Sequence, residues 1–311
     1  RPDIAGIMGA FGAALIARDR YEGKQTTMLS IEQINDLKFE TKLARCGGCT
    51  NNCLLTINKF SGNRQYITGN RCEKGIGKAK NKEQIPNLFE YKLHRIFDYE
   101  PLSEEEATRG TLGMPRVLNI YENYPFWHAF FTRLGFSVVL SDNSNKATYE
   151  SGIESMPSES VCYPAKLSHG HVMNLIAKDP DFIWMPCVRW ERKEDPTAGN
   201  CYNCPIVMSY PTALGLNVDA ITENHVEFMY PFVPYHEKVE LKRRLYELLA
   251  VERVADAEAG RGRVRGPKLT RTEIDQAVNA AYEADARFHQ DIQTMGEEAM
   301  RWIEDNGGHG I

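Results

Sequence analysis

The chain has 311 residues, 42% of them hydrophobic and 25% charged, and a formal net charge of -5 at pH 7. These proportions are those of a soluble globular protein, long enough for one large domain or two smaller ones. The negative charge argues against a general nucleic-acid-binding protein, which would carry a basic surface. No apolar run reaches the roughly 18 residues of a membrane-spanning helix. The start does not resemble a signal peptide. We therefore expect a cytoplasmic protein that binds neither nucleic acid nor membrane.

The first predicted element is a helix of small residues over 4–18. Its small residues recur three or four positions apart, which places them on one side of a helix and allows close packing on a partner: Gly6, Gly9, Ala13 and Ala17. A connecting segment with a short strand or helix is expected over 30–42. Because the chain opens without Met and ends in Gly-Gly-His-Gly-Ile, we expect it to be a piece of a longer protein.

The first of two cysteine clusters contains Cys46, Cys49, Cys53 and Cys72. The alternating segments 54–60 and 65–68 predict a β-hairpin that returns Cys72 towards the other three. The spacing C-x2-C-x3-C with a remote fourth cysteine indicates a metal site. Four thiolates suit a [4Fe–4S] cluster, which we favour, and they also suit tetrahedral zinc. Clustered cysteines without an export signal favour metal over disulfides.

After this module, strands and helices alternate along the chain. Following a helix at 85–99 and a charged linker, strands are predicted at 116–121, 136–140, 181–185 and 218–222, and helices at 125–134, 147–155, 163–177 and 205–214. This rhythm predicts parallel strands with right-handed crossovers. The fold class is therefore α/β, a flavodoxin- or Rossmann-like parallel sheet with flanking helices, plus the small cysteine-rich hairpin module. Helices at 237–250 and from Thr270 to about 305, the latter opened by a capping box, are expected to serve in packing.

The second cysteine cluster contains Cys162, Cys187, Cys201 and Cys204. Ligands of open α/β sheets bind beyond the carboxyl ends of the strands, and Cys187 follows the strand predicted at 181–185. Cys162 and Cys204 each precede a predicted helix, where the helix dipole and free N–H groups stabilise a thiolate or a cluster sulfide. Three cysteines at such loop ends can meet on one side of the sheet, which predicts a second metal site.

Three further residues are candidates for catalysis. His169 and His171 flank Gly170 in a predicted helix. They are expected to pack there, and the alternative is a proton donor or hydrogen-bond partner beside a cluster. Glu122 follows a predicted strand end and would either line the same crevice or belong to a turn. No catalytic residue is assigned beyond these candidates.

Several stretches together resemble a known family: Gly113-Met-Pro-Arg-Val-Leu, Tyr-Glu-Asn-Tyr-Pro-Phe-Trp127, Leu134-Gly-Phe, Cys162-Tyr-Pro-Ala-Lys-Leu, His169-Gly-His and Asn203-Cys-Pro-Ile-Val. They resemble the 2-hydroxyacyl-CoA dehydratase-related domain of large CoA-substrate-specific enzyme activase proteins. The resemblance implies five parts: the end of an upstream ATPase-type activase domain with a connector (1–42), the cysteine-rich hairpin (43–80), a helix and linker (81–112), the dehydratase-like α/β domain (113–235) and helices leading to a missing second domain (236–311).

The resemblance also implies a function. In such proteins ATP hydrolysis on the activase drives a low-potential electron into a dehydratase cluster. Carried onto this chain, Cys162, Cys187 and Cys204 would bind a [4Fe–4S] cluster, relatives carry a double-cubane type, and Cys201 is a spare or a fourth ligand. The implied partners are the upstream activase domain and an acyl-CoA or another small substrate, and a homodimer is left open. The piece alone is not expected to be a complete enzyme.

Three hypotheses follow. The first, which we favour, is an iron–sulfur redox module that passes low-potential electrons in an ATP-dependent 2-hydroxyacyl-CoA dehydratase/activase-type system. The second is a reductive or dehydratase enzyme in its own right, acting on a small substrate at an open iron. The third is a zinc-stabilised structural or interaction domain.

Overall fold

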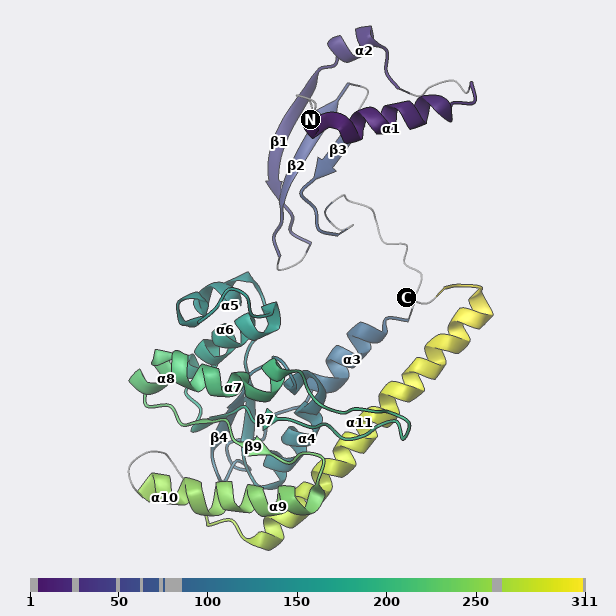
Figure 1. Cartoon of the computed structure of the whole chain (residues 1–311). Helices are drawn as coiled ribbons and strands as arrows, with labels where there is room; N and C mark the ends of the chain where they lie inside the picture. The colour runs from purple at the N-terminus through teal and green to yellow at the C-terminus, as the bar shows by residue number, and fades with distance from the viewer. Residues whose placement is uncertain are drawn as a thin grey trace. The chain divides into compact units, whose positions relative to one another are not determined.

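The structure of the chain is a computed structural model that describes residues 5–23, 28–48, 51–61, 64–72, 75, 86–258 and 265–309. The chain divides into two compact units, residues 1–80 and 81–311 (Figure 1).

The first unit contains one three-stranded antiparallel sheet, in the order β1-β2-β3, and short helices. The elements are η1 (Ala5–Ile7), α1 (Met8–Asp19), α2 (Ile31–Asn35), β1 (Phe39–Arg45), β2 (Leu54–Phe60) and β3 (Arg64–Thr68). The predicted helix over 4–18 is present as η1 and α1, and the predicted hairpin is confirmed as β2 and β3. The connecting segment holds both a short helix and a strand, and this strand, β1, pairs along the whole of β2.

The second unit is built on a four-stranded parallel sheet in the order β5-β4-β6-β8, with a small parallel pair β7-β9. Its elements are α3 (Leu88–Phe97), β4 (Thr111–Met114), α4 (Ile120–Arg133), β5 (Ser137–Leu140), α5 (Lys146–Ser151), η3 (Ile153–Ser155), α6 (Tyr163–Ala177), β6 (Phe182–Trp184), β7 (Cys187–Val188), α7 (Pro205–Asn217), α8 (Asp219–Glu223), β8 (Phe228–Met229), β9 (Phe232–Val233), α9 (Lys238–Tyr246), the π-helical η4 (Glu247–Glu252), α10 (Arg253–Glu258) and α11 (Arg271–Asn306). The predicted α/β class is confirmed.

Two predicted strands are wrong. Residues 116–121 form a turn and the start of α4, and the strand lies earlier, at β4. Leu118 has a φ of 53°, which is incompatible with a strand. Residues 218–222 fall mostly in α8, and the strand that follows is β8. The predictions over 136–140, 163–177, 181–185 and 205–214 correspond to β5, α6, β6 and α7.

Side chains leave the central strand β6 alternately to two faces of the sheet, as its period of two requires. Phe182 and Trp184 join a core with α3, α4, α9, η4 and α11. Ile183 and Met185 join a second core with α6, α7 and α8. The unit is therefore a three-layer α/β/α arrangement, with helices on both faces of the sheet as buried parallel sheets require.

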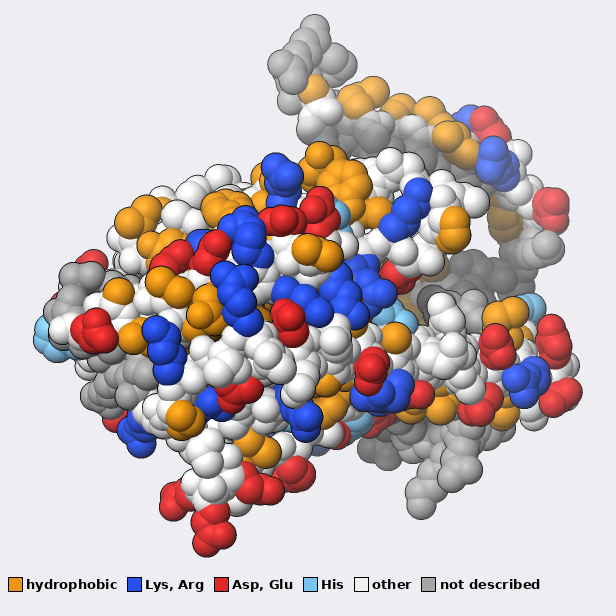
Figure 2. All heavy atoms as spheres, turned by 90° about the horizontal axis from the view of Figure 1, so that it is seen from below, with side chains coloured by type: hydrophobic (Ala, Val, Ile, Leu, Met, Phe, Trp, Pro, Cys, Tyr) orange, Lys and Arg blue, Asp and Glu red, His pale blue; other side chains and the backbone are white. Residues whose placement is uncertain are grey.

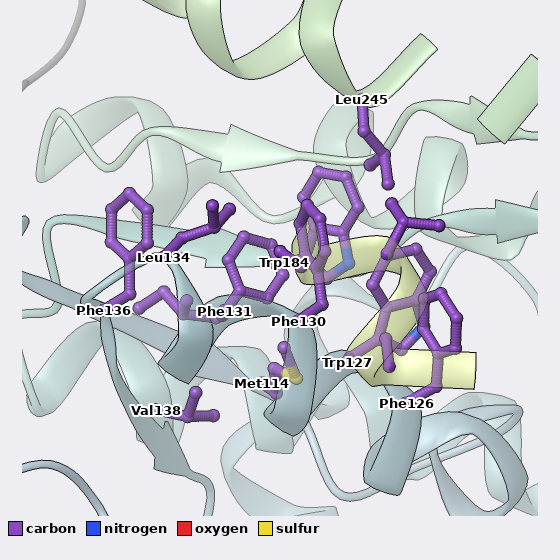
Figure 3. Packing of buried hydrophobic residues seen from close by; sticks show 14 of the residues in the cluster. Met114, Phe126, Trp127, Phe130, Phe131, Leu134, Phe136, Val138, Trp184 and Leu245 are labelled. Atoms are coloured by element: carbon purple, nitrogen blue, oxygen red, sulfur yellow. The ribbon is translucent and has the colours of Figure 1, made fainter. Parts of the chain in front are cut away.

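Aromatic residues fill the larger of the two cores (Figure 3). Trp127, Phe130 and Phe131 of α4 are fully buried, and the ring centroid of Trp184 lies 5.2 Å from that of Trp127 and 5.3 Å from that of Phe131. Edge-to-face contacts of this kind stabilise a core beyond the area that they bury. The helices after residue 236 belong to this same core, since Leu241, Leu245 and Ile274 are fully buried in it.

The long helix α11 begins as predicted, with a capping box formed by Thr270 and Glu273. On α9, Arg243 pairs with Glu240 and Glu247, and Arg244 pairs with Glu252. Seen from below, Lys and Arg side chains are interspersed with Asp and Glu (Figure 2). No described helix combines the length and the apolar character needed to cross a membrane.

Candidate functional site

Two cysteines occupy equivalent positions at the beginnings of neighbouring helices. Cys162 is the N-cap of α6 and Cys204 is the N-cap of α7, each in extended backbone, and Pro164 and Pro205 lie in the first turns. Proline suits that position because the first-turn N–H groups have no helical partner. The helices α6 and α7 pack against each other in the second core. Both thiols are exposed, and both cysteines precede a helix, as predicted.

The third predicted ligand, Cys187, lies at the start of β7 and is fully buried. Its Sγ lies 3.8 Å from Oγ1 of Thr212 on α7, and burial raises the pKa of its thiol. Thus α7 carries Cys204 at its first turn and touches Cys187 two turns later.

Residues 187–204 form a narrow antiparallel excursion that returns the chain from β7 to α7. Trp190 and Tyr202 are bridged, with ring centroids 4.1 Å apart. The N–H of Glu191 donates to the carbonyl of Cys201 and that of Asn203 to the carbonyl of Arg189, both across the excursion. We call residues 187–204 the cysteine hairpin; it is a different segment from the cysteine-rich hairpin expected over residues 43–80. It holds three of the four cysteines of this cluster.

The described cysteines are free thiols. Within the described ranges, no three or more Cys, His, Asp or Glu side chains are grouped closely enough to hold a single metal ion. Cys201, the remaining cysteine of this cluster, is partly buried.

The predicted candidate His169 is fully buried in α6 and hydrogen-bonded at both ring nitrogens. Nδ1 lies 2.8 Å from Oγ of Ser155, and Nε2 lies 2.9 Å from the hydroxyl of Tyr210. Because Ser155 donates its hydrogen to the carbonyl of Gly152, its oxygen must accept from Nδ1–H, and Tyr210 then donates to Nε2. Burial lowers the pKa of His169 to about 4, so the ring is neutral at pH 7.

Tyr210 connects this histidine to the cysteine region. Burial, and then the nearby thiol of Cys162, raise the pKa of its phenol. The hydroxyl therefore stays protonated and serves His169 as a donor. His169 is thus bound between η3 and α7, which is the packing role expected of it, and a role as proton donor stays a prediction.

His171 is the second candidate and lies on the other side of α6. Its Nδ1 lies 2.8 Å from Oγ of Ser141 and its Nε2 lies 2.9 Å from Oγ of Ser144. Burial lowers its pKa to about 4. These bonds join α6 to the loop after β5, and His171 is fully buried there.

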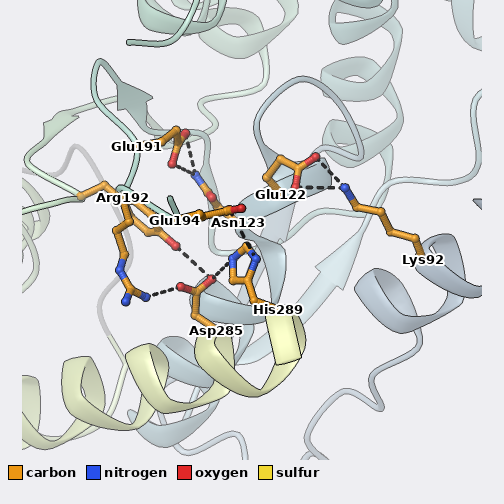
Figure 4. Close-up of polar contacts among 9 residues, drawn as sticks. Lys92, Glu122, Asn123, Glu191, Arg192, Glu194, Asp285 and His289 are labelled. Atoms are coloured by element: carbon orange, nitrogen blue, oxygen red, sulfur yellow. Dashed lines mark hydrogen bonds and ion pairs between the residues drawn. The ribbon is translucent and has the colours of Figure 1, made fainter. Parts of the chain in front are cut away.

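The third candidate, Glu122, lies in the first turn of α4 and not after a strand. Its carboxylate pairs with Lys92 of α3 at 2.9 and 3.2 Å. The next residue, Asn123, reaches instead towards the carboxylate of Glu191 in the cysteine hairpin (Figure 4). The sequence gave no sign of Glu191, whose partner Asn123 comes from a distant part of the chain.

A pocket of about 470 Å³ opens beyond the ends of β4 and β5. Aromatic and apolar side chains line it together with the polar residues Ser141 and Asn143, and its charged groups are Arg116, Asp142 and Lys178. Lys178 donates to the Leu140 carbonyl at 2.8 Å and pairs with Asp142 at 2.7 Å. Bonds from Lys178 and Asn174 lower the pKa of the Asp142 carboxyl. The lysine thus occupies the open edge of β5.

In the first unit, three cysteines lie at one end of the sheet. Cys46 follows β1 and Cys53 precedes β2, and the N–H of Cys46 donates to the Cys53 carbonyl at 2.9 Å. Cys72 follows β3, and a Cβ at the nearby Gly75 would lie 3.4 Å from the Leu55 side chain, so this segment returns to the start of β2. Cys49, the fourth predicted ligand, lies outside the described residues.

Comparison with known protein families identifies the family of the chain. The family model of the CoA enzyme activase uncharacterised domain (DUF2229) matches residues 111–311, more than half of the 311 residues. The chain belongs to this family. No curated protein and no solved structure matches it. Membership of this CoA enzyme activase family confirms the broad part of the resemblance read from the sequence, and the matched region contains all four cysteines of the second cluster.

Proposed function

We propose that this chain is the iron–sulfur redox module of an ATP-dependent 2-hydroxyacyl-CoA dehydratase/activase-type system. In this proposal Cys162, Cys187 and Cys204 bind a [4Fe–4S] cluster. The observation that carries it is the arrangement around α7: two exposed cysteines cap the paired helices α6 and α7, and a third cysteine contacts α7 from the cysteine hairpin. Membership of a CoA enzyme activase family supports the assignment.

The chemistry of these positions fits a cluster. Iron–sulfur clusters are held by cysteine thiolates and accept hydrogen bonds at sulfur. The N-termini of α6 and α7 offer positive dipole ends and first-turn backbone N–H groups, and the N–H of Val207 donates to Sγ of Cys204 at 3.4 Å. A four-iron cluster spreads its ligands over several irons, so the sulfurs need not meet at one ion. When bound, it would supply one-electron transfer.

Cys201 fits the role of ligand less well than Cys204. In extended backbone, side chains three positions apart point to opposite faces. Cys201 belongs to the paired part of the cysteine hairpin, where its carbonyl accepts from the N–H of Glu191 and Tyr202 pairs with Trp190, whereas Cys204 begins α7. Three ligands would leave one iron open to an acyl-CoA or another small substrate, whereas a fourth would favour an electron relay.

The first unit is proposed as a second metal site. Its cysteines at the end of the β1-β2-β3 sheet suit four-thiolate coordination, with a [4Fe–4S] cluster favoured and zinc as the alternative. Its partner in the proposal is an activase ATPase domain, which would supply electrons.

Anaerobic purification of the whole chain tests the proposal. We expect a brown protein with absorbance near 400 nm and about four irons and four sulfides per cluster. The Cys204→Ser variant should lose the iron of one cluster, and the matched Cys201→Ser variant should keep it. A colourless protein that contains zinc and no sulfide would overturn the proposal and favour the zinc-stabilised structural domain.

A further inference from the structure

One side-chain amide joins the backbones next to two of the proposed ligands. Nδ2 of Asn203 donates to the carbonyl of Val188 at 3.0 Å and to the carboxylate of Glu191 at 2.6 Å. An amide nitrogen has two hydrogens, so both of its donors are used. Val188 follows Cys187 and Asn203 precedes Cys204, so this amide fixes the spacing of the two cysteines in the cysteine hairpin.

The carboxylate of Glu191 in turn fixes the orientation of that amide. It accepts from Asn203 and, at 3.2 and 3.3 Å, from Nδ2 of Asn123 on α4 (Figure 4). Its own backbone N–H donates to the carbonyl of Cys201. Glu191 therefore contacts the backbone of Cys201 and the side chain of Asn203, which precedes Cys204. It links both to α4 through Asn123.

The neighbouring residue ties the cysteine hairpin to a second helix. Arg192 pairs with Asp285 of α11 at 2.5 Å, and its guanidinium lies 4.9 Å from the ring centroid of Tyr282. Asp285 is almost fully buried and also accepts from the hydroxyl of Tyr235 at 3.3 Å. Two adjacent residues of the cysteine hairpin are thus anchored on α4 and α11.

We propose that Glu191, acting through Asn203, is a positioning residue that holds Cys187 and Cys204 at the spacing the cluster requires. This inference rests on the proposed function. It adds that Glu191, which would not touch the cluster, determines whether two of the three cysteine ligands are in place. Residues that hydrogen-bond to metal ligands orient those ligands at metal sites in general. The Asn203 amide is partly buried, and when its acceptor is removed it loses its fixed orientation, because an unpaired polar group is costly where water is partly excluded.

The test compares two substitutions of Glu191 with a control in the same hairpin. Glu191→Met keeps the shape and removes the acceptor, whereas Glu191→Gln keeps one acceptor oxygen for Asn203. Glu194→Met is the control, because that side chain is 69% exposed and pairs with His289 rather than with Asn203. Asn203→Asp perturbs the same contact from the other side, by placing an acceptor against Glu191 and Val188. Tryptophan fluorescence confirms that each variant is folded.

Two readouts separate the positioning role from the cluster itself. Hydrogen exchange of peptides from 188–204, measured on metal-free protein, should accelerate about tenfold in Glu191→Met and Asn203→Asp. It should change little in Glu191→Gln and Glu194→Met. In anaerobic protein, the first two variants should lose at least about half of the iron of one cluster, and the Gln variant should keep its iron and the wild-type electron paramagnetic resonance spectrum.

Each outcome bears on one claim. If wild-type protein binds no iron, the proposed function fails and the exchange data alone decide whether Glu191 orders the hairpin. If Glu191→Met exchanges like Glu194→Met, the positioning role is overturned. It is also overturned if exchange accelerates while iron content and the resonance spectrum stay those of the wild type.

Discussion

The contact between α5 and α6 gives a prediction with an unambiguous sign. A Cβ added at Gly170, in the middle of α6, would lie 1.6 Å from the carbonyl oxygen of Thr148 on α5. Real Cβ atoms essentially never approach within 3.0 Å. The two helices would therefore have to separate by about 1.4 Å (3.0 minus 1.6), and the obstacle is backbone, which cannot turn aside.

Gly170→Ala should therefore destabilise the second unit. At an open helix position the same change stabilises by up to about 1 kcal/mol, because alanine is the better helix former. Forcing extra volume into a packed contact costs typically about 1–3 kcal/mol. Because the obstacle is backbone, we place the cost of Gly170→Ala at the upper end of that range, and after the gain in helix propensity the expected net loss is about 2 kcal/mol. Gly296→Ala in α11 is the matched control, since a Cβ there meets nothing within 4 Å and should bring a gain of up to about 1 kcal/mol.

Urea unfolding followed by tryptophan fluorescence measures both variants. The protein has four tryptophans, and Trp127, Trp184, Trp190 and Trp302 all lie in the second unit, so the signal reports that unit. In thermal unfolding each kcal/mol corresponds to a shift of about 2–4 °C for a unit of this size. The packing argument is refuted if Gly170→Ala is as stable as the wild type or moves in the same direction as Gly296→Ala.

Three further predictions concern stability. Glu227→Gln should cost about 1–3 kcal/mol in urea unfolding, because it replaces the carboxylate 2.9 Å from the guanidinium of Arg253, which is only 3% exposed, with a neutral amide; a variant as stable as the wild type would contradict this. Thr270→Ala should cost about 1 kcal/mol through loss of the α11 cap, and a matched Thr294→Ala should cost less. Burial lowers the pKa of His128, His169 and His171 to about 4. The unfolded chain therefore binds more protons between pH 6.5 and 4, and the free energy of unfolding should fall as the pH falls through this window. Urea midpoints at pH 7, 5.5 and 4.5 check this, and midpoints independent of pH would refute it.

The sequence predicted those elements whose local pattern agrees with their tertiary environment. Helix α6 and strand β6 show this, since apolar periodicity and flanking polar residues marked both. One of the two wrong strand predictions concerns a strand that contains glycine. In β4, Gly113 is poor in strand propensity, yet a Cβ there would lie only 3.0 Å from Leu175 and 3.2 Å from Pro180. Close packing of α6 on the sheet selects glycine at this position, and that contact cannot be read from neighbouring residues.

The same limit applies to the candidate site. Cys162 and Cys204 could be placed before helices because caps and first-turn prolines are local signals. The contact between Glu191 and Asn203 depends on the antiparallel excursion around Trp190 and Tyr202, which has a single bridged pair and no alternating pattern of its own. Asn123 and Asp285 reach this region from α4 and α11, about 70 and 90 positions away along the chain. Such partners follow from the tertiary fold alone.

The helix caps of this chain give a last argument about its cysteines. Ser30, Asn87, Asn145 and Thr270 cap α2, α3, α5 and α11, and each side chain accepts a backbone N–H. These are the residue types that cap best. In contrast, Cys162 makes no such bond, and Cys204 accepts only through sulfur, at 3.4 Å from the nitrogen of Val207. Capping strength therefore does not account for cysteine at α6 and α7, although serine would fit the same backbone. What distinguishes cysteine at the N-caps of these two packed helices is the chemistry of its thiolate, which is the property that a cluster requires.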